Sequence, residues 1–380
     1  MVSVLGAYTG NTSLFPTYAS EQDQMIQKIQ SQTAARFAEK KATIDDSYKQ
    51  KQATVEAESN RWITVKADIF NAKAAVDSSK DSIKSISNLL LEMRTPVSLA
   101  GTAGENRKAQ VEIFNNKLLS INGEADRMGR AFNLIGSINR VDYTPNKIEY
   151  RNDLGVGKTT LTGGYAGSDY RIEATDGSVW IPDLGTNSLS QYSELQGQKQ
   201  KVTLTGDDGK PITIDKTASY TNGLSVTSYD PKTGAITMSV TIVPESGPIT
   251  VNGTLKKNGL GLMPAWFYDG LATDAGRKRA FTDINEAESQ LTIASSKVQQ
   301  AAGQVSMDTR KVDGALDTLN KQNTKALVTQ LEESQKLQTE YVQQVQAMQN
   351  NLDQLSRQQQ NYLQAFSSQI ADGGFLDIML

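Results

Sequence analysis

The residue types available for chemistry in this chain are restricted by two absences. Its 380 residues include no cysteine, which excludes disulfides, thiolate nucleophiles and Cys-ligated zinc or iron–sulfur sites. They also include no histidine, the commonest general base and transition-metal ligand. Ser-His-Asp triads and zincin motifs are therefore excluded. Only chemistry performed by carboxylates, Lys, Tyr, Ser or Thr remains.

One fragment looks like a nucleotide site. Gly155 to Thr160, with the sequence GVGKTT, resembles the end of a P-loop. The first glycine of that motif should stand at Asn152, and the sequence from Leu161 to Tyr165 cannot start the helix that would hold the phosphates. The fragment is therefore interpreted as a Gly-rich loop among β-strands.

Acidic and aromatic clusters are further candidates for binding sites. Asp176-Gly177 and Asp207 to Gly209 could be calcium loops, but neither has the full set of ligands with a closing Glu, so both are interpreted as turns. Nothing in the sequence selects a pair of carboxylates for acid–base work. The aromatic residues Trp266 to Tyr268 are interpreted as packing between a β domain and helices, with a binding surface as the alternative. No catalytic residue, metal ligand or cofactor is assigned, and the chain is predicted not to be an enzyme.

Charge and hydropathy limit the partners. The net charge of −3 comes from 39 basic and 42 acidic residues interspersed along the chain, which disfavours nucleic acid and anionic membrane surfaces. No window approaches the run of about 18 apolar residues that spans a bilayer. Residues 1–11 have no basic segment and no long apolar segment, so a cleaved secretory signal is not predicted.

The strongest pattern is the spacing of apolar residues in two terminal arms. A heptad seam is predicted in the first arm at Tyr48, Val55, Trp62, Ile69, Val76, Ile83 and Leu90. A second seam is predicted at Leu327, Leu331, Tyr341, Val345, Met348, Leu352, Leu355, Tyr362 and Phe366. Its 3.5-residue spacing predicts a left-handed supercoil, and the two arms are expected to pair within one subunit.

Capping and breaking residues set the predicted limits of these helices. Ser20 is predicted as the N-cap region of the first arm, and Thr95-Pro96 as its end. A further helix over about 105–134 is expected to fold back along that arm. Gly303 and Gly314 are marked as weak points of the second arm.

Between the arms, residues 141–275 are rich in Gly, Thr, Asp and β-formers. Hairpins are predicted over 201–214 and 225–242, the second with a Pro- and Gly-containing turn at 230–234. The predicted fold class is α+β, a long antiparallel helical coiled-coil bundle formed by both termini with an inserted β-rich domain. The predicted layout is an N-terminal segment ordered on assembly (1–20), the first arm and return helix (20–140), the insert (141–275), the second arm (276–371) and an apolar tail (372–380).

The two chain ends are predicted to take part in assembly, because an apolar tail costs solubility unless something covers it. Docking of the tail on its own subunit is the alternative. The predicted assembly residues are Val2, Val4, Leu5, Phe375, Leu376, Ile378, Met379 and Leu380.

This layout resembles bacterial flagellins and their hook-associated relatives. The stretch with Arg107, Gln110 and Glu112 that leads to Phe132-Asn133 is similar to the flagellin segment before its Phe-Asn-Gly turn, although Leu134 replaces that glycine. The resemblance implies a subunit that is exported without a cleaved signal peptide and forms an extracellular homopolymer. The terminal arms would form the core and the β domain would face outward. An export chaperone is considered as a further partner.

Two other functions stay open. A needle-tip or translocator-type protein of a type III secretion system also combines a long coiled coil with an inserted domain. An enzyme or adhesin activity in the β insert is the third hypothesis.

Overall fold

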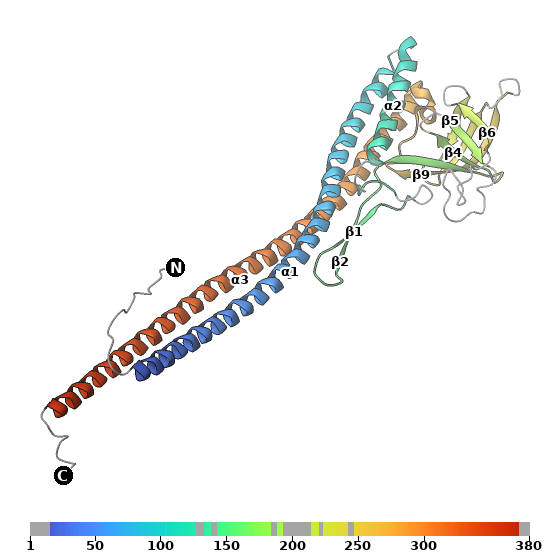
Figure 1. The fold of residues 1–380 in the computed structure, drawn as a ribbon. Helices are drawn as coiled ribbons and strands as arrows, with labels where there is room; N and C mark the ends of the chain where they lie inside the picture. The colour runs from blue at the N-terminus through green and yellow to red at the C-terminus, as the bar shows by residue number, and fades with distance from the viewer. Residues whose placement is uncertain are drawn as a thin grey trace. The chain divides into compact units, whose positions relative to one another are not determined.

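The computed structural model describes residues 16–102, 104–126, 133–137, 143–183, 188–192, 214–219, 223–241 and 247–371 (Figure 1). The chain divides into two compact units. We call residues 61–314 the body unit, and the helical segments 16–60 and 315–371 the arm unit. Long helices come from both ends of the chain and antiparallel β-sheet lies between them, so the predicted α+β class with an inserted β domain is confirmed.

The first helix, α1, is longer than predicted at both ends and runs over Pro16–Leu99. Its start at a proline suits the first helical turn, where the missing N–H has no partner to lose. The predicted stop at Pro96 is wrong, because the helix continues through it. Pro96 lies in the last turn, and its neighbours Val97 and Ala100 are fully buried, so packing holds the backbone helical.

The second helix, α2, spans Arg107–Ala125 and ends before the predicted limit of 134. The Asn133 amide donates to the carbonyl of Ala125 at 2.8 Å and closes the helix C-terminus. Leu134 is fully buried in the turn that follows, and its N–H donates to the Ser79 hydroxyl of α1 at 2.8 Å. Apolar residues that suggested more helix therefore pack in a turn.

The third helix, α3, runs unbroken over Asp274–Ala371. It passes through Gly303 and Gly314, the predicted weak points. A helical glycine costs about 1 kcal/mol relative to Ala, which is less than the burial of one large side chain contributes. Val305 and Val312 beside these glycines are buried, so the helix persists.

In the body unit, α1 and α3 pair antiparallel in a heptad pattern. Ion pairs join Lys66 to Asp313 at 2.7 Å and Arg94 to Glu288 at 2.9 Å. The inward positions alternate by threes and fours, as in a coiled-coil seam. They are positions 62, 65, 69, 72, 76, 79, 83, 86, 90, 93, 97 and 100 of α1 and 280, 284, 287, 291, 294, 298, 301, 305, 308 and 312 of α3.

Helix α2 folds back along α1 as predicted. The Arg107 guanidinium donates to the carbonyl of Ala100 at 3.3 Å, and Lys117 pairs with Glu92. A short 3-10 turn, Gly104–Asn106, precedes α2. The three helices therefore form the helical layer of the body unit.

In the arm unit, α1 and α3 also pair antiparallel but with a different period. The rings of Phe37 and Tyr341 lie 4.5 Å apart, and Gln330 donates to Asp45 at 3.1 Å. From Leu319 onward the less exposed positions of α3, apart from Thr329, are 319, 323, 326, 330, 334, 337, 341, 345, 348 and 352. This set repeats every 11 residues, or about 3.67 residues per turn, and such spacing does not favour the predicted left-handed supercoil.

The β region contains two antiparallel sheets in the described residues. The first is a hairpin of β1 (Lys147–Arg151) and β2 (Lys158–Thr162). The second has the order β6-β5-β4-β3-β9-β8-β7. Its strands are β3 (Ser168–Ala174), β4 (Val179–Asp183), β5 (Ser188–Tyr192), β6 (Ile214–Ser219), β7 (Leu224–Tyr229), β8 (Ala235–Val240) and β9 (Ile249–Gly259).

The predicted hairpin at 225–242 is confirmed as β7 and β8. Its turn is closed by Asp230, whose carboxylate accepts from the N–H of Lys232 at 2.9 Å and from the Thr233 hydroxyl at 2.7 Å. Gly234 takes a φ of 73°, which a glycine adopts without strain. The other predicted hairpin lies outside the described residues except for Ile214, which begins β6.

Candidate assembly surfaces

An aromatic cluster fixes the large sheet to the helices of the body unit. It lies on η3, a 3-10 segment over Ala265–Leu271. Trp266 donates to the Tyr170 hydroxyl of β3 at 3.2 Å, and the Tyr268 hydroxyl donates to Asp283 of α3 at 2.7 Å. Burial and the nearby Asp283 carboxylate raise the pKa of Tyr268 well above its usual value. These buried rings pack the sheet onto the helices, as the sequence predicted.

A buried carboxylate fastens the β1–β2 hairpin to α3. Asp308 accepts from the Tyr150 hydroxyl at 2.7 Å and from the Thr159 hydroxyl at 2.9 Å. It also accepts from the Gln304 amide at 3.3 Å and is only 6% exposed. Burial and the bond to Asp308 raise the pKa of Tyr150. The sequence reasoning missed this contact, although a charged residue at a heptad seam position between Val305 and Val312 was a signal.

Two contacts with α1 hold the same hairpin from its other side. Arg151 of β1 pairs with Asp68 at 2.8 Å. The Arg61 guanidinium donates to the carbonyl of Leu154 in the hairpin loop at 2.9 Å. The hairpin is therefore held by both long helices within the body unit.

The P-loop-like fragment forms the loop and second strand of this hairpin. The Asp153 carboxylate accepts from the N–H groups of Gly155 at 2.8 Å and Gly157 at 3.1 Å. These are the amides that a phosphate would need, and a strand rather than a helix follows at Lys158. The interpretation as a loop among strands is confirmed. Val156, at its tip, is 98% exposed.

The acidic turns also fit the sequence interpretation where the structure describes them. Asp176 accepts from the N–H of Ser178 at 2.9 Å and from its hydroxyl at 2.6 Å, in the turn between β3 and β4. Residues 207–209 lie outside the described residues. Within the described ranges, no group of three or more acidic side chains is placed to hold a metal ion.

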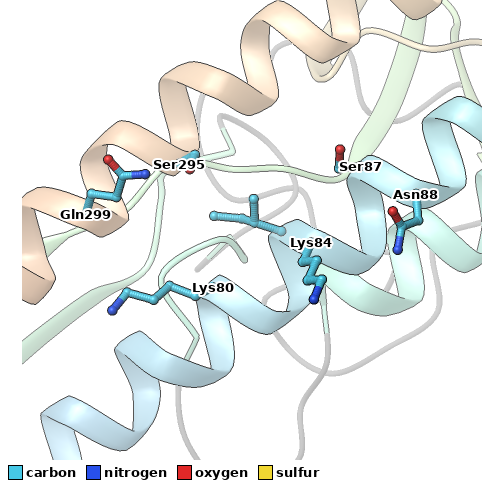
Figure 2. Close-up of a pocket in the computed structure, with 7 residues that line it drawn as sticks. Lys80, Lys84, Ser87, Asn88, Ser295 and Gln299 are labelled. Atoms are coloured by element: carbon cyan, nitrogen blue, oxygen red, sulfur yellow. The ribbon is translucent and has the colours of Figure 1, made fainter.

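A shallow groove runs between α1 and α3 in the body unit (Figure 2). Its volume is about 420 Å³, and it is lined by Lys80, Ile83, Lys84, Ser87, Asn88, Ser295 and Gln299. Lys80 forms an ion pair with Asp77 at 3.4 Å. The other polar groups of the lining are the Lys84 ammonium, two serine hydroxyls and two side-chain amides. Such a lining can contact a carbonyl-rich or acidic chain segment, but it offers no paired acid and base.

The arm unit leaves apolar surface uncovered. Among its described side chains, only Tyr48 and Leu319 are buried. On α3 a second apolar stripe lies beside the inward face, and we call it the arm stripe. It consists of Leu327, Val328, Leu331 and Val342, all of them exposed.

The predicted seam residues divide between inward and exposed positions. Tyr48, Ile69, Val76, Ile83 and Leu90 of α1 are buried, and Val55 and Trp62 are half-buried. Tyr341, Val345, Met348 and Leu352 of α3 are half-buried. Leu327, Leu331, Leu355 and Tyr362 are exposed, which a seam within one chain does not allow.

The period of the arm explains this division. A heptad and the observed 11-residue repeat coincide at positions 334, 341, 345, 348 and 352, and they differ by one residue at the inward positions 326, 330 and 337. The inward positions are therefore Ala326 and Gln330 rather than Leu327 and Leu331. The Phe366 side chain lies outside the described part of the structure.

The predicted assembly residues at the chain ends, Val2, Val4, Leu5 and Phe375 to Leu380, also lie outside the described residues. None of the described helices combines the length and the apolar character needed to cross a bilayer.

Comparison with known proteins finds similar solved structures but no match in sequence. No family model matches the chain, and no curated protein matches it. Similar solved structures are FlgL of Xanthomonas campestris and flagellar hook-associated protein-3 of Legionella pneumophila. The first has 14% identity and a TM-score of 0.30, covering 75% of this chain and 99% of that chain. The second has 12% identity and a TM-score of 0.30, covering 77% of this chain and 99% of that chain. A likeness at this level does not establish a function.

Proposed function

We propose that this chain is a structural subunit that self-assembles through its arm unit into an extracellular filament. The observation that supports this most directly is the uncovered apolar surface of the arm. Among the described side chains of the arm unit, only two are buried in total, one on α1 and one on α3. The arm stripe is exposed. A helix pair with apolar residues on two faces of one helix needs a further helix to cover the second face.

The energetic scale supports assembly over an isolated arm. Fully burying one Leu or Val contributes roughly 1.5 to 3 kcal/mol. The four residues of the arm stripe together contribute at most about 6 to 12 kcal/mol, which lies within the association cost of about 4 to 15 kcal/mol, so further contacts along the arm would favour assembly. Met25, Leu355, Tyr362 and Leu363 are exposed in the same unit and add apolar surface elsewhere on the arm that further contacts could bury.

The chain ends belong to the same proposal. We propose that the apolar residues near the chain ends, Val2, Val4, Leu5 and Phe375 to Leu380, contribute to contacts between associated subunits, because burying apolar side chains stabilises an interface. We also propose that the chain is exported before it assembles.

The test is polymerisation of a variant with Leu327→Asp and Leu331→Asp, measured by sedimentation beside the intact protein. We expect polymer to be lost while helicity by circular dichroism is unchanged, since both side chains already face solvent in the subunit. Leu119→Asp is the matched control, because Leu119 is an exposed apolar residue of α2 in the body unit. Polymerisation of the double variant at the level of the intact chain would refute the proposal.

A further inference from the structure

The loop of the β1–β2 hairpin presents an apolar side chain on a fixed support. Val156 is 98% exposed, while the backbone around it is held by Asp153. The N–H of Asn152 also donates to the carbonyl of Gly157 at 3.3 Å, which closes the base of the loop. A side chain on such a loop binds with little loss of backbone entropy.

The hairpin does not change its position freely, because it is fastened to both helices of the body unit. Asp308 of α3 and Asp68 of α1 hold its strands, and Arg61 holds the loop carbonyl of Leu154. The tip therefore lies near the level of Arg61 on α1, on the side where Arg61 and Asp68 point. Figure 1 shows the hairpin standing away from the large sheet at this level of the body unit.

A second apolar feature lies at the same level on another side of α1. We call it the body stripe, and it consists of Ile63, Ala67, Phe70 and Ala74, at heptad spacing and all exposed. Phe70 is 67% exposed. Each residue advances about 100° round a helix, so Ile63 and Phe70 lie about 200° from Arg61 and Asp68, respectively. The hairpin tip and the body stripe therefore face nearly opposite directions.

Two different features on opposite faces suit a contact between copies of this chain. Because the tip cannot reach the body stripe of its own chain, each copy can give a tip to one neighbour and receive a tip from another. Such a head-to-tail contact is heterologous and generates rings or helical polymers. A two-fold dimer would instead need one surface that complements itself.

The size of the contact decides between a second copy and an independent partner. A contact of one valine with one isoleucine and one phenylalanine buries far less area than the roughly 800 Å² per partner of a stable specific interface. It cannot recruit a free protein by itself. Between subunits already aligned by their arms, the effective concentration is high, and a small contact can set the register of neighbours.

We propose that the hairpin tip, Gly155 to Gly157, docks on the body stripe of a second copy of this chain, with Val156 between Ile63 and Phe70. This inference rests on the proposed function, because it assigns a lateral contact within the assembly. Its role is to fix the spacing of adjacent subunits, while the arm stripe supplies most of the buried area.

Single cysteines test this contact, because the chain has none of its own. Val156→Cys and Ala67→Cys proteins are mixed, assembled under reducing conditions and then mildly oxidised. Ala67 lies between Ile63 and Phe70, so this substitution leaves both large side chains in place. A disulfide needs Cα atoms about 4.4 to 6.8 Å apart, so it reports direct contact. We expect a covalent dimer on a non-reducing gel from the mixture and none from either protein alone.

A mixture of Val156→Cys with Leu119→Cys is the matched control, and it should give no dimer. If polymers form but the Val156 and Ala67 mixture gives no more dimer than this control, the docking inference is overturned and the proposed function stands. Equal dimer from Val156→Cys alone would show a tip-to-tip contact and also overturn it. If the intact chain forms no polymer under any condition, the proposed function and this inference fall together.

Discussion

The bond between Tyr150 and Asp308 offers the sharpest test of how the hairpin is held. Tyr150→Phe removes one hydroxyl and leaves the buried ring in place. The lost bond is 2.7 Å long and ends on a carboxylate that is nearly inaccessible to water. Thr159 and Gln304 still donate to Asp308 in the variant, so the carboxylate is not left without partners.

The magnitude follows from these contacts. A hydrogen bond to a charged group contributes about 1.5 to 3 kcal/mol, and the remaining donors place Tyr150→Phe near the lower end. Adding Thr159→Val removes the second short bond and leaves the carboxylate with one weak donor at 3.3 Å. Breaking a buried charge interaction in this way costs about 3 to 5 kcal/mol, so the double variant should lose more than the sum of the two single changes.

Urea unfolding followed by tryptophan fluorescence measures this effect without interference from the arms. All three tryptophans, Trp62, Trp180 and Trp266, belong to the body unit. Tyr362→Phe is the control, because Tyr362 is 77% exposed and belongs to the arm unit, and it should change nothing. A Tyr150→Phe protein that unfolds at the same urea concentration as the intact chain would refute the assigned bond.

Three further predictions concern the body unit and α3. The pKa values of Tyr150 and Tyr268 are raised by burial and by their acidic partners, so the folded chain holds both phenolic protons more tightly than the unfolded chain. The contribution of these two groups to the free energy of unfolding should be complete below about pH 10 and should decline at higher pH. The urea midpoint of the intact chain should therefore fall above that pH, and it should fall less steeply with pH in Tyr268→Phe. Gly163→Ala should prevent stable folding of the body unit, at a cost of about 4 kcal/mol or more, because its Cβ would collide with the Leu134 carbonyl; normal tryptophan emission would contradict this. Gly303→Ala should raise helix stability by about 1 kcal/mol, because that helical position is exposed and open, and an unchanged thermal melt would count against it.

Local patterns predicted the parts of the fold that depend on local signals. The heptad in α1 from Trp62 to Leu90 matches the inward face, because period and burial agree there. The β7–β8 hairpin was predictable because Asp230 and Gly234 specify its turn chemically. These signals lie within a few residues of the structure that they determine.

Two of the failures share one physical cause, which is competition from distant contacts. Pro96 should end a helix, but the packing of Val97 and Ala100 in the body unit outweighs the lost hydrogen bond. Asp308 meets Tyr150 across 158 positions of sequence, a contact that no local pattern specifies.

Period errors form a separate class. Over the short window 341–352 a heptad cannot be distinguished from an 11-residue repeat, so the seam was extended in the wrong register to Leu327 and Leu355. Those residues then appeared as an exposed stripe rather than as an internal seam.

Self-association through the arms is the central claim, and electron microscopy of the purified intact chain over a range of concentrations tests it most directly. The uncovered arm stripe predicts filaments above a critical concentration, with none in the Leu327→Asp, Leu331→Asp variant. A chain that stays monomeric or forms only a small closed ring at every concentration would contradict the account.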